Sequence, residues 1–437
     1  MPERNEKDML TIVKADSGEQ SRFIHALKKR AQQTDKDVSA VVAQIIENVR
    51  AHGDQAVREY TEKFDGVAPE KTEVSSQEIA ALTKSCAPAF LQALEKAAGN
   101  IRSFHQRQVQ QSWLTAENDG VLMGQRVRGL ARVGIYVPGG TAAYPSSVLM
   151  NAIPAKIAGV QEIIMVTPPG KDGKPNPDIM AAAQIAGVDR VFMMGGAQAV
   201  AALAFGTQTV PKVDKIVGPG NIYVATAKKL LYGIVDIDMI AGPSEILIIA
   251  DQNANPEFLA ADLMSQAEHD VLASAILLTD SPVLAQQVQD ALASQIQKLS
   301  RADIILQSLR DYGAIILCKN IDQAVELANE LAPEHLEVCT ENPMEYIGRL
   351  DNAGSVFLGA YAPEPLGDYY AGPNHVLPTS GTARFFSPLS VDSFIKKSSF
   401  IYYTAAALQK GSADIVALAN AEGLTAHANS IKVRLEK

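Results

Sequence analysis

The sequence predicts an α/β protein with two parallel sheets, and three observations support this prediction. Short runs rich in β-branched residues alternate with helix-length segments from residue 127 onward. These runs form two series, which divide near the segment AGPSE at 241–245. The second strand of each series ends in a similar turn segment, VTPPG in the first and LTDSP in the second. Strands that alternate with helices are typical of βαβ units. We therefore expect two Rossmann-like domains of related plan, with helical extensions at both ends of the chain.

The first part of the chain predicts helices. The segment DVSAVVAQIIENVRAHG carries apolar residues at helical spacing, and a longer amphipathic stretch follows from SSQEIAALTK to FHQRQVQQSW. Pro88 is expected to separate two helices within that stretch. We assign residues 1–30 to an N-terminal helical extension. Residues 31–135 together with 245–380 are expected to form the first Rossmann-like domain.

The two series predict nine strands. The first series contains RVGIYVPGG, EIIMVTPP, RVFMMGG and KIVGPGN, and the second contains EILIIAD, AILLTD, GAIILC, HLEVCT and GSVFLG. Residues 136–244 are expected to form the second Rossmann-like domain. The segment from Gly359 to Phe394 has no period and predicts a long functional loop, because its aromatic residues argue against disorder. Residues 381–437 are expected to form a C-terminal helical tail with a break at Gly423.

Composition and charge exclude several classes of partner. The formal net charge of the 437 residues is -10, which argues against a nucleic-acid or anionic-membrane partner. The three cysteines, Cys86, Cys318 and Cys339, lie far apart, so we expect a reducing compartment and no disulfide framework. No apolar run has the length needed to cross a bilayer, and the charged N-terminus has no signal-peptide core. The sequence therefore predicts a cytoplasmic protein.

Four of the seven histidines stand beside carboxylate or amide groups. These are His269 in DLMSQAEHD, His335 in PEHLEV, His375 in GDYYAGPNHVLP and His427 in AEGLTAHANS. Gln266 and His269 are three residues apart, so they share one face if the helix continues. Imidazole is a common zinc ligand, although a surface helix with one histidine also explains this spacing.

Two further patterns carry ionisable pairs. Glu334 and His335 are adjacent after Pro333. A strand sends neighbouring side chains to opposite faces, but a helix-to-strand turn can bring both into one cleft, where one activates water and the other moves protons. A capping carboxylate beside a strand histidine fits equally well. Asp368 and His375 form the ionisable pair of the long loop, where an exposed carboxylate is the plain alternative.

Glycine turns give a weaker cofactor signal. No G-x-G-x-x-G stands between a strand and a helix, which counts against an ordinary dinucleotide fingerprint. The turns VPGG at 137–140, GGAQA at 195–199 and GPGN at 218–221 each follow a predicted strand and precede a helix. Such turns can present backbone N–H groups and a helix N-terminus to a phosphate. Tight packing between helix and strand also explains them.

Taken in order, the segments YVPGG, GGAQA, VGPGN, AGPSE, SQAEHD, LAPEHLE, GDYYAGPNHVLPT and EGLTAH resemble the histidinol dehydrogenase family. The resemblance covers nearly the whole chain. It implies an NAD-dependent alcohol dehydrogenase that oxidises L-histidinol through L-histidinaldehyde to L-histidine with two NAD. This reaction is the last step of histidine biosynthesis, and the family binds one zinc ion per site.

The resemblance also implies roles for individual residues. Glu334 and His335 match the catalytic pair, and Tyr136, Gln198 and Asn221 match NAD contacts. The zinc ligands would be Gln266, His269, Asp368 and His427. The substrate contacts would be these four ligands, the catalytic pair, Ser244, His375 and Glu422. The family forms an intertwined homodimer with shared sites, in which the residues that match Glu422 and His427 come from the partner subunit.

Two other functions remain open at this point. A related zinc- and NAD-dependent dehydrogenase could act on another amino alcohol or diol, but the presence of Glu422 and His375 favours histidinol. A zinc hydrolase that uses Glu334 and water would need no nucleotide. NAD binding separates the dehydrogenases from the hydrolase.

Overall fold

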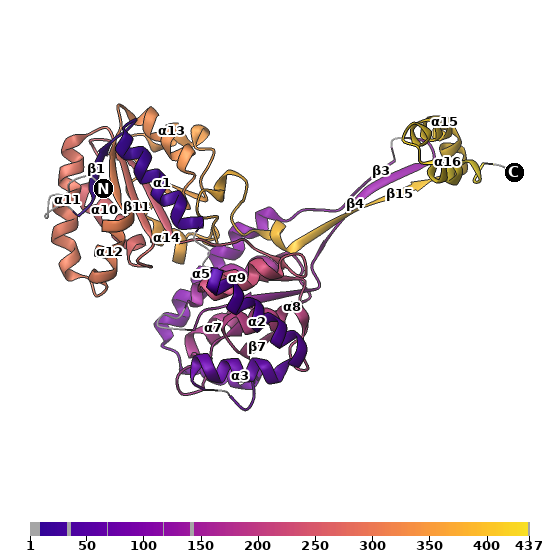
Figure 1. The fold of residues 1–437 in the computed structure, drawn as a ribbon, viewed down its shortest axis with the longest axis horizontal. Coiled ribbons are helices and arrows are strands. Elements are labelled where there is room, and N and C mark those ends of the chain that lie inside the picture. Colours follow the sequence, from indigo (N-terminus) through magenta and orange to yellow (C-terminus); the bar gives the residue numbers. More distant parts are fainter. Residues whose placement is uncertain (1–8, 33–35, 68, 117, 140–143, 436–437) are drawn as a thin grey trace.

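The computed structural model describes residues 9–32, 36–67, 69–116, 118–139 and 144–435. Within these ranges the chain forms two six-stranded sheets and a three-stranded antiparallel arm (Figure 1). The predicted α/β class is confirmed. Residues 1–8 of the expected N-terminal extension, and Gly140 of the VPGG turn, lie outside the described residues. No helix in the described ranges is both long and apolar enough to span a bilayer.

The first sheet, sheet A, has strand order β1-β12-β11-β10-β13-β14, and all of its pairs are parallel. Its strands are β1 (Thr11–Lys14), β10 (Glu245–Ala250), β11 (Ser274–Thr279), β12 (Ala314–Leu317), β13 (His335–Cys339) and β14 (Ser355–Leu358). Its helices are α1 (Gly18–Gln32), α10 (Pro256–Ala267), α11 (Pro282–Gln295), α12 (Ala302–Tyr312) and α13 (Ile321–Leu331). Ile248 belongs to the apolar cluster on one face, and Leu247 and Ile249 to the cluster on the other. Successive side chains of a strand alternate between faces, so both faces of this sheet are buried.

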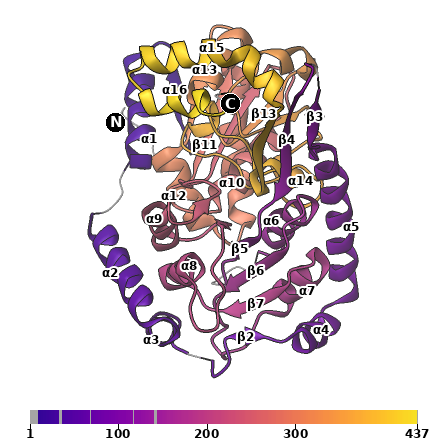
Figure 2. The same ribbon diagram turned by 90° about the vertical axis from the view of Figure 1, so that its right-hand side faces the viewer.

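The second sheet, sheet B, has strand order β2-β7-β6-β5-β8-β9, in which only the β2–β7 pair is antiparallel. Its strands are β2 (Glu73–Val74), β5 (Arg132–Tyr136), β6 (Glu162–Thr167), β7 (Arg190–Met193), β8 (Lys215–Val217) and β9 (Asp236–Ile237). One face is covered by α2 (Lys36–His52), α3 (Asp54–Asp65), α8 (Gly196–Phe205) and α9 (Ile222–Leu231). The other face is covered by α4 (Ser76–Ser85), α5 (Pro88–His105), α6 (Pro145–Ile157) and α7 (Pro177–Ala186) (Figure 2).

The two sheets share one plan, as the two strand series predict. In each sheet the first strand of the series is central, the second and third lie on one side, and the fourth lies on the other, followed at the edge by β14 in sheet A and by β9, which was not predicted, in sheet B. A strand from earlier in the chain, β1 or β2, closes the edge beside the third strand. All nine predicted strands are present. Strand order reverses between β10 and β13 and between β5 and β8, which is where ligand sites form in open α/β sheets.

The division of the chain between the sheets differs from the expected one. Residues 31–135 were assigned with 245–380, but α2 to α5 pack against sheet B. The expected N-terminal helical extension instead supplies β1, which pairs with β12 and completes sheet A. In α2, Val42 and Ile46 are buried and belong to the apolar cluster that includes residues of α8 and α9. Helical periodicity shows that a helix has a buried face, but it does not show which sheet covers that face.

The arm is built from segments that lie far apart in the sequence. The strand β4 (Val121–Gly129) pairs along its whole length with β15 (Ile395–Tyr403), and β3 (Trp113–Thr115) pairs with the outer part of β4. The helices α15 (Ala405–Ala421) and α16 (Thr425–Lys432) lie at its far end, well away from both sheets (Figure 1). Gly423 makes the predicted break between them, with φ +74°. The expectation of a wholly helical tail is wrong, because the segment IKKSSFIYY is rich in residues that favour strands.

Candidate functional site

The predicted catalytic pair lies at the amino ends of the strands of sheet A. The helix α13 ends, Ala332 adopts φ +51°, and the chain passes through Glu334 into β13, which His335 begins. Both side chains are buried, and Glu334 Oε2 lies 3.7 Å from His335 Nδ1. The helix-to-strand turn therefore brings the two groups together, as the sequence predicts. Ser244 precedes the neighbouring strand β10, and its carbonyl accepts a hydrogen bond from Ser274.

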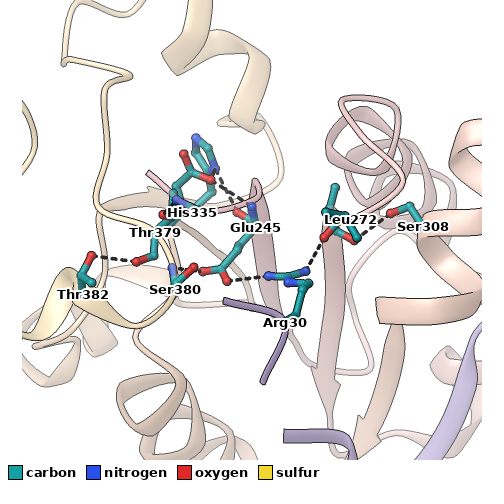
Figure 3. Close-up of polar contacts among 11 residues, drawn as sticks. Arg30, Glu245, Leu272, Ser308, His335, Thr379, Ser380 and Thr382 are labelled. Atoms are coloured by element: carbon teal, nitrogen blue, oxygen red, sulfur yellow. Dashed lines mark hydrogen bonds and ion pairs between the residues drawn. The ribbon is translucent and has the colours of Figure 1, made fainter. Parts of the chain in front are cut away.

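The backbone of one residue, Glu245, contacts both members of this pair. The N–H of Glu245 donates to Glu334 Oε2 at 2.9 Å, and its carbonyl oxygen lies 3.0 Å from His335 Nδ1. A carbonyl oxygen only accepts hydrogen bonds, so Nδ1 carries the proton and Nε2 is the basic nitrogen. The Glu245 side chain is held in turn by Arg30 Nη2 at 2.9 Å and by the N–H of Ser380 at 3.1 Å (Figure 3).

Burial sets the protonation of this group of residues. Burial raises the pKa of Glu334 well above its ordinary value, and the neighbouring carboxylates of Glu245 and Asp368 act in the same direction. Burial lowers the pKa of His335 to about 4, and the Asp368 carboxylate opposes this effect. Burial also raises the pKa of Glu245, and Arg30 opposes it. The site therefore presents a neutral imidazole beside a carboxyl group that binds protons more readily than an exposed one.

Gln266 and His269 lie at the end of α10 and in the turn that follows it. Gln266 is fully buried, and neither of its amide atoms has a hydrogen-bond partner among the described residues. The helix α10 ends at Ala267, so His269 stands in the following turn, where its N–H donates to the carbonyl of Gln266 at 3.2 Å. The Asp270 carboxylate accepts the N–H of Leu272 at 2.8 Å in the same connection. His269 also contributes to the lowered pKa of His335, although less than burial does.

Asp368 comes from a short helix inside the predicted loop. This helix, α14 (Glu364–Tyr369), has a proline within its first two positions. The carbonyl of Asp368 lies 3.1 Å from His375 Nδ1, so the two residues come together as the sequence suggests. His375 Nε2 lies 3.3 Å from Ser147 Oγ on α6. This contact joins the loop of sheet A to the helix that follows the central strand of sheet B.

Sequence reasoning missed Glu364, which lies at the centre of the site. It is buried, and its Oε1 is 3.8 Å from His335 Nε2 and lacks a hydrogen-bond partner among the described residues. Burial raises the pKa of Glu364 to about 9, with further contributions from Asp368. Ligand atoms of His335, Glu364 and Asp368 lie within 4.8 Å of one another. A cavity of about 300 Å³ opens beside them, and His375 also lines it. The sequence held one signal for Glu364: it stands four residues before Asp368, and residues at this spacing share a helix face.

Two predicted site residues lie far from this place in the same chain. Glu422 ends α15 and His427 lies in α16, and both are exposed at the tip of the arm (Figure 1). The predicted positions of these residues on two helices separated by Gly423 are confirmed. The structure does not bring them to the site of their own chain.

The predicted cofactor contacts lie at the carboxyl ends of sheet B. Tyr136 ends β5, and its hydroxyl accepts the N–H of Gly196 at 3.0 Å. Gln198, in the first turn of α8, is buried, and both of its amide atoms lack partners within the described part of the chain. Asn221 caps α9, because its Oδ1 accepts the N–H groups of Tyr223 and Val224. The three residues therefore surround the point where strand order reverses in sheet B.

Comparison with known proteins shows the family of this chain. The profile of the histidinol dehydrogenase family matches residues 28–435. The chain is 57% identical over 430 residues to the histidinol dehydrogenase of Clostridium acetobutylicum, with 98% of this chain and 100% of the relative covered. It is also 57% identical over 400 residues to that of Listeria monocytogenes serovar 1/2a, with 92% and 93% covered. The crystal structure of histidinol dehydrogenase from Elizabethkingia anophelis superposes with a TM-score of 0.92 at 39% identity, with 98% of both chains covered. The chain is an oxidoreductase and belongs to the histidinol dehydrogenase family.

Proposed function

We propose that this protein is a zinc-dependent dehydrogenase that oxidises L-histidinol through L-histidinaldehyde to L-histidine with two NAD, the last step of histidine biosynthesis. One observation carries the proposal. The backbone of Glu245 holds Glu334 and the Nδ1–H tautomer of His335 in place, and the ligand atoms of His335, Glu364 and Asp368 lie within 4.8 Å of one another. That arrangement supplies a base, a second proton carrier and donors for a metal ion. The cytoplasmic location stays a prediction of the sequence.

The residues present fit a zinc ion. A buried amide without hydrogen bonds lowers the stability of the fold, and binding of a metal ion by Gln266 Oε1 would offset that loss. His269 and Asp368 add imidazole and carboxylate donors of the kind that zinc binds, and we assign the remaining position to His427 of a second copy. When bound, zinc holds the amine and imidazole of the substrate and so fixes the carbinol carbon for reaction.

The chain's own residues account for the proton transfers. In the first oxidation the alcohol gives a hydride to NAD and its hydroxyl proton to Nε2 of His335. In the second, Glu334 takes a proton from water as the water adds to the aldehyde, and the aldehyde oxygen receives the proton that His335 gained in the first oxidation. The resulting hydrate gives a hydride to a second NAD and a hydroxyl proton back to His335, which leaves the carboxyl group of histidine. Burial lowers the pKa of His335, so its Nε2 is unprotonated and free to accept a proton at neutral pH. Burial raises the pKa of Glu334 and so makes it a stronger base than an exposed glutamate.

The proposed cofactor site faces the proposed substrate site. Tyr136, Gln198 and Asn221 stand at the carboxyl ends of sheet B, where nucleotides bind in open α/β sheets. The unpartnered amide of Gln198 is a ready group for the cofactor. The Ser147–His375 contact ties the two sheets together beside the substrate cavity. A hydride can then pass between groups that are held by different sheets.

A second copy of the chain would complete each site. Glu422 and His427 are carried away from their own site by the arm. The arm also exposes large apolar side chains, such as Ile401 at 71% and Leu418 at 68%. A surface of this kind marks an interface. These observations support an intertwined homodimer that shares its sites.

The test uses purified protein with zinc, NAD and L-histidinol. We expect about two NADH for each histidine formed, because each oxidation transfers one hydride. Other amino alcohols and diols serve as control substrates, and metal analysis gives the zinc content. Failure to form NADH with histidinol in zinc-replete protein would refute the proposal. Faster oxidation of another amino alcohol would support the dehydrogenase activity but refute histidinol as the substrate.

A further inference from the structure

A buried ion pair holds the glycine turn that follows β8. Lys228 on α9 and Asp238 after β9 form this pair, and their side chains are 5% and 2% exposed. Lys228 Nζ donates to the carbonyl of Gly218 at 3.0 Å, and Asp238 Oδ2 accepts the N–H of Gly218 at 2.8 Å. Both backbone groups of Gly218 are therefore bound by one ion pair.

The turn packs directly against the end of the central strand. Gly218 has φ +108°, a conformation that favours glycine, and a Cβ at this position would overlap the carbonyl of Tyr136. The hydroxyl of the same tyrosine accepts the N–H of Gly196 at the start of α8. Three residues after Gly218, Asn221 caps α9. A shift of the turn would therefore move all the residues that surround the reversal point of sheet B.

The buried charges need an explanation beyond stability. Burying two charges costs desolvation, and apolar residues of similar volume often stabilise a fold as well or better. What the pair adds is a fixed position for its polar partners. Asp238 also accepts the N–H of Met239 through Oδ1, so the carboxylate itself is held at both oxygens. The pair thus clamps a flexible glycine turn between two rigid attachment points.

We propose that Lys228 and Asp238 are positioning residues for the dinucleotide cofactor. This inference rests on the proposed function, in which Tyr136, Gln198 and Asn221 contact NAD. The ion pair holds Gly218 against Tyr136 and so sets the spacing between these contacts. Neither charged side chain is exposed, so each acts through the turn and not by direct contact with the cofactor.

The test compares two methionine substitutions on one helix. Lys228→Met removes the clamp, whereas Lys229→Met makes the same chemical change at the exposed neighbouring position. We expect Lys228→Met to raise the KM for NAD by about tenfold or more, the size of effect that a small misplacement of binding groups produces. The KM for histidinol and the zinc content should stay close to those of the wild type and of Lys229→Met. Equal rises in both KM values, or no rise in either, would overturn the inference.

A double variant separates positioning from stability. Replacing Lys228 by Met and Asp238 by Leu removes both charges together, so the folding defect of a lone buried charge is avoided. We expect this variant to unfold near the wild-type urea midpoint and still to bind NAD weakly by calorimetry. A wild-type affinity for NAD in the stable double variant would refute the positioning role. If the wild-type protein itself binds no NAD, the proposed function fails and this inference fails with it. If the wild type oxidises histidinol with NAD and both variants keep its affinity, only the inference fails.

Discussion

The ion pair between Arg30 and Glu245 gives the sharpest test of how the site is held. The Arg30 side chain is 3% exposed, pairs with Glu245 and also donates to the carbonyl of Leu272. Arg30→Met removes the charged partner of Glu245, whose side chain is only 14% exposed. Breaking a buried pair in this way costs about 3–5 kcal/mol. An exposed pair costs less than about 1 kcal/mol. Lys28→Met on the same helix is the control, because Lys28 is 60% exposed and lies 4.0 Å from Glu330.

Urea unfolding of four proteins measures the pair itself. The wild type, Arg30→Met, Glu245→Gln and the double variant form a double-mutant cycle. We expect the double variant to lose at least about 2 kcal/mol less than the sum of the single losses, because removing both charges leaves none unpaired. A change in midpoint at constant slope identifies the loss as one of stability. Additive losses, or a loss from Arg30→Met no larger than that from Lys28→Met, would refute the reasoning.

Three further outcomes follow from the site and its surroundings. Glu334→Gln should spare the first oxidation more than the second, since only the second needs an activated water; single-turnover rates from histidinol and from the aldehyde measure this, and equal losses would contradict the role. His427→Asn should retain less zinc by metal analysis, and mixing it with His335→Asn under proven subunit exchange should restore part of the activity, whereas strict lack of rescue would favour one-chain sites. His105 is fully buried, and burial lowers its pKa below 6.5. Below pH 6.5 His105 binds a proton more readily in the unfolded chain than in the folded protein, so the free energy of unfolding falls as the pH drops. His105→Gln should flatten this slope in unfolding experiments between pH 7 and 5, and an unchanged slope would show that other groups cause it.

The local pattern of residues was sufficient to predict the strands of the two sheets. Each of the nine predicted strands is a short run rich in β-branched or other apolar residues, and such a run can be recognised as a strand from its own residues alone. The turn before His335 was predictable for a similar reason, because Pro333 and the preceding helix limit the backbone locally. The end of α10 before His269 was not predictable, because the Asp270 carboxylate accepts the N–H of Leu272 only once the chain has turned.

The supporting residues of the site could not be found from local pattern. Arg30 meets Glu245 across 215 positions of sequence, and nothing in the segment KKR distinguishes this arginine from a surface charge. Glu245 stands in a segment that the resemblance includes, but its role depends on its main chain, which every residue possesses. The strand Ile395–Tyr403 was missed because its partner lies almost three hundred residues earlier and no core beneath it imposes an alternating pattern.

On the proposal that two copies share each site, the arm makes catalytic activity depend on the protein concentration. If Glu422 and His427 serve only the site of another copy, a lone chain has a substrate cavity and a cofactor side but an incomplete set of ligands. Specific activity should then fall on dilution, and fall together with the mass measured by light scattering. The same geometry means that an inactive chain carrying an intact tip can still support the site of a working chain, so a mixed population need not lose activity in proportion to its defective members.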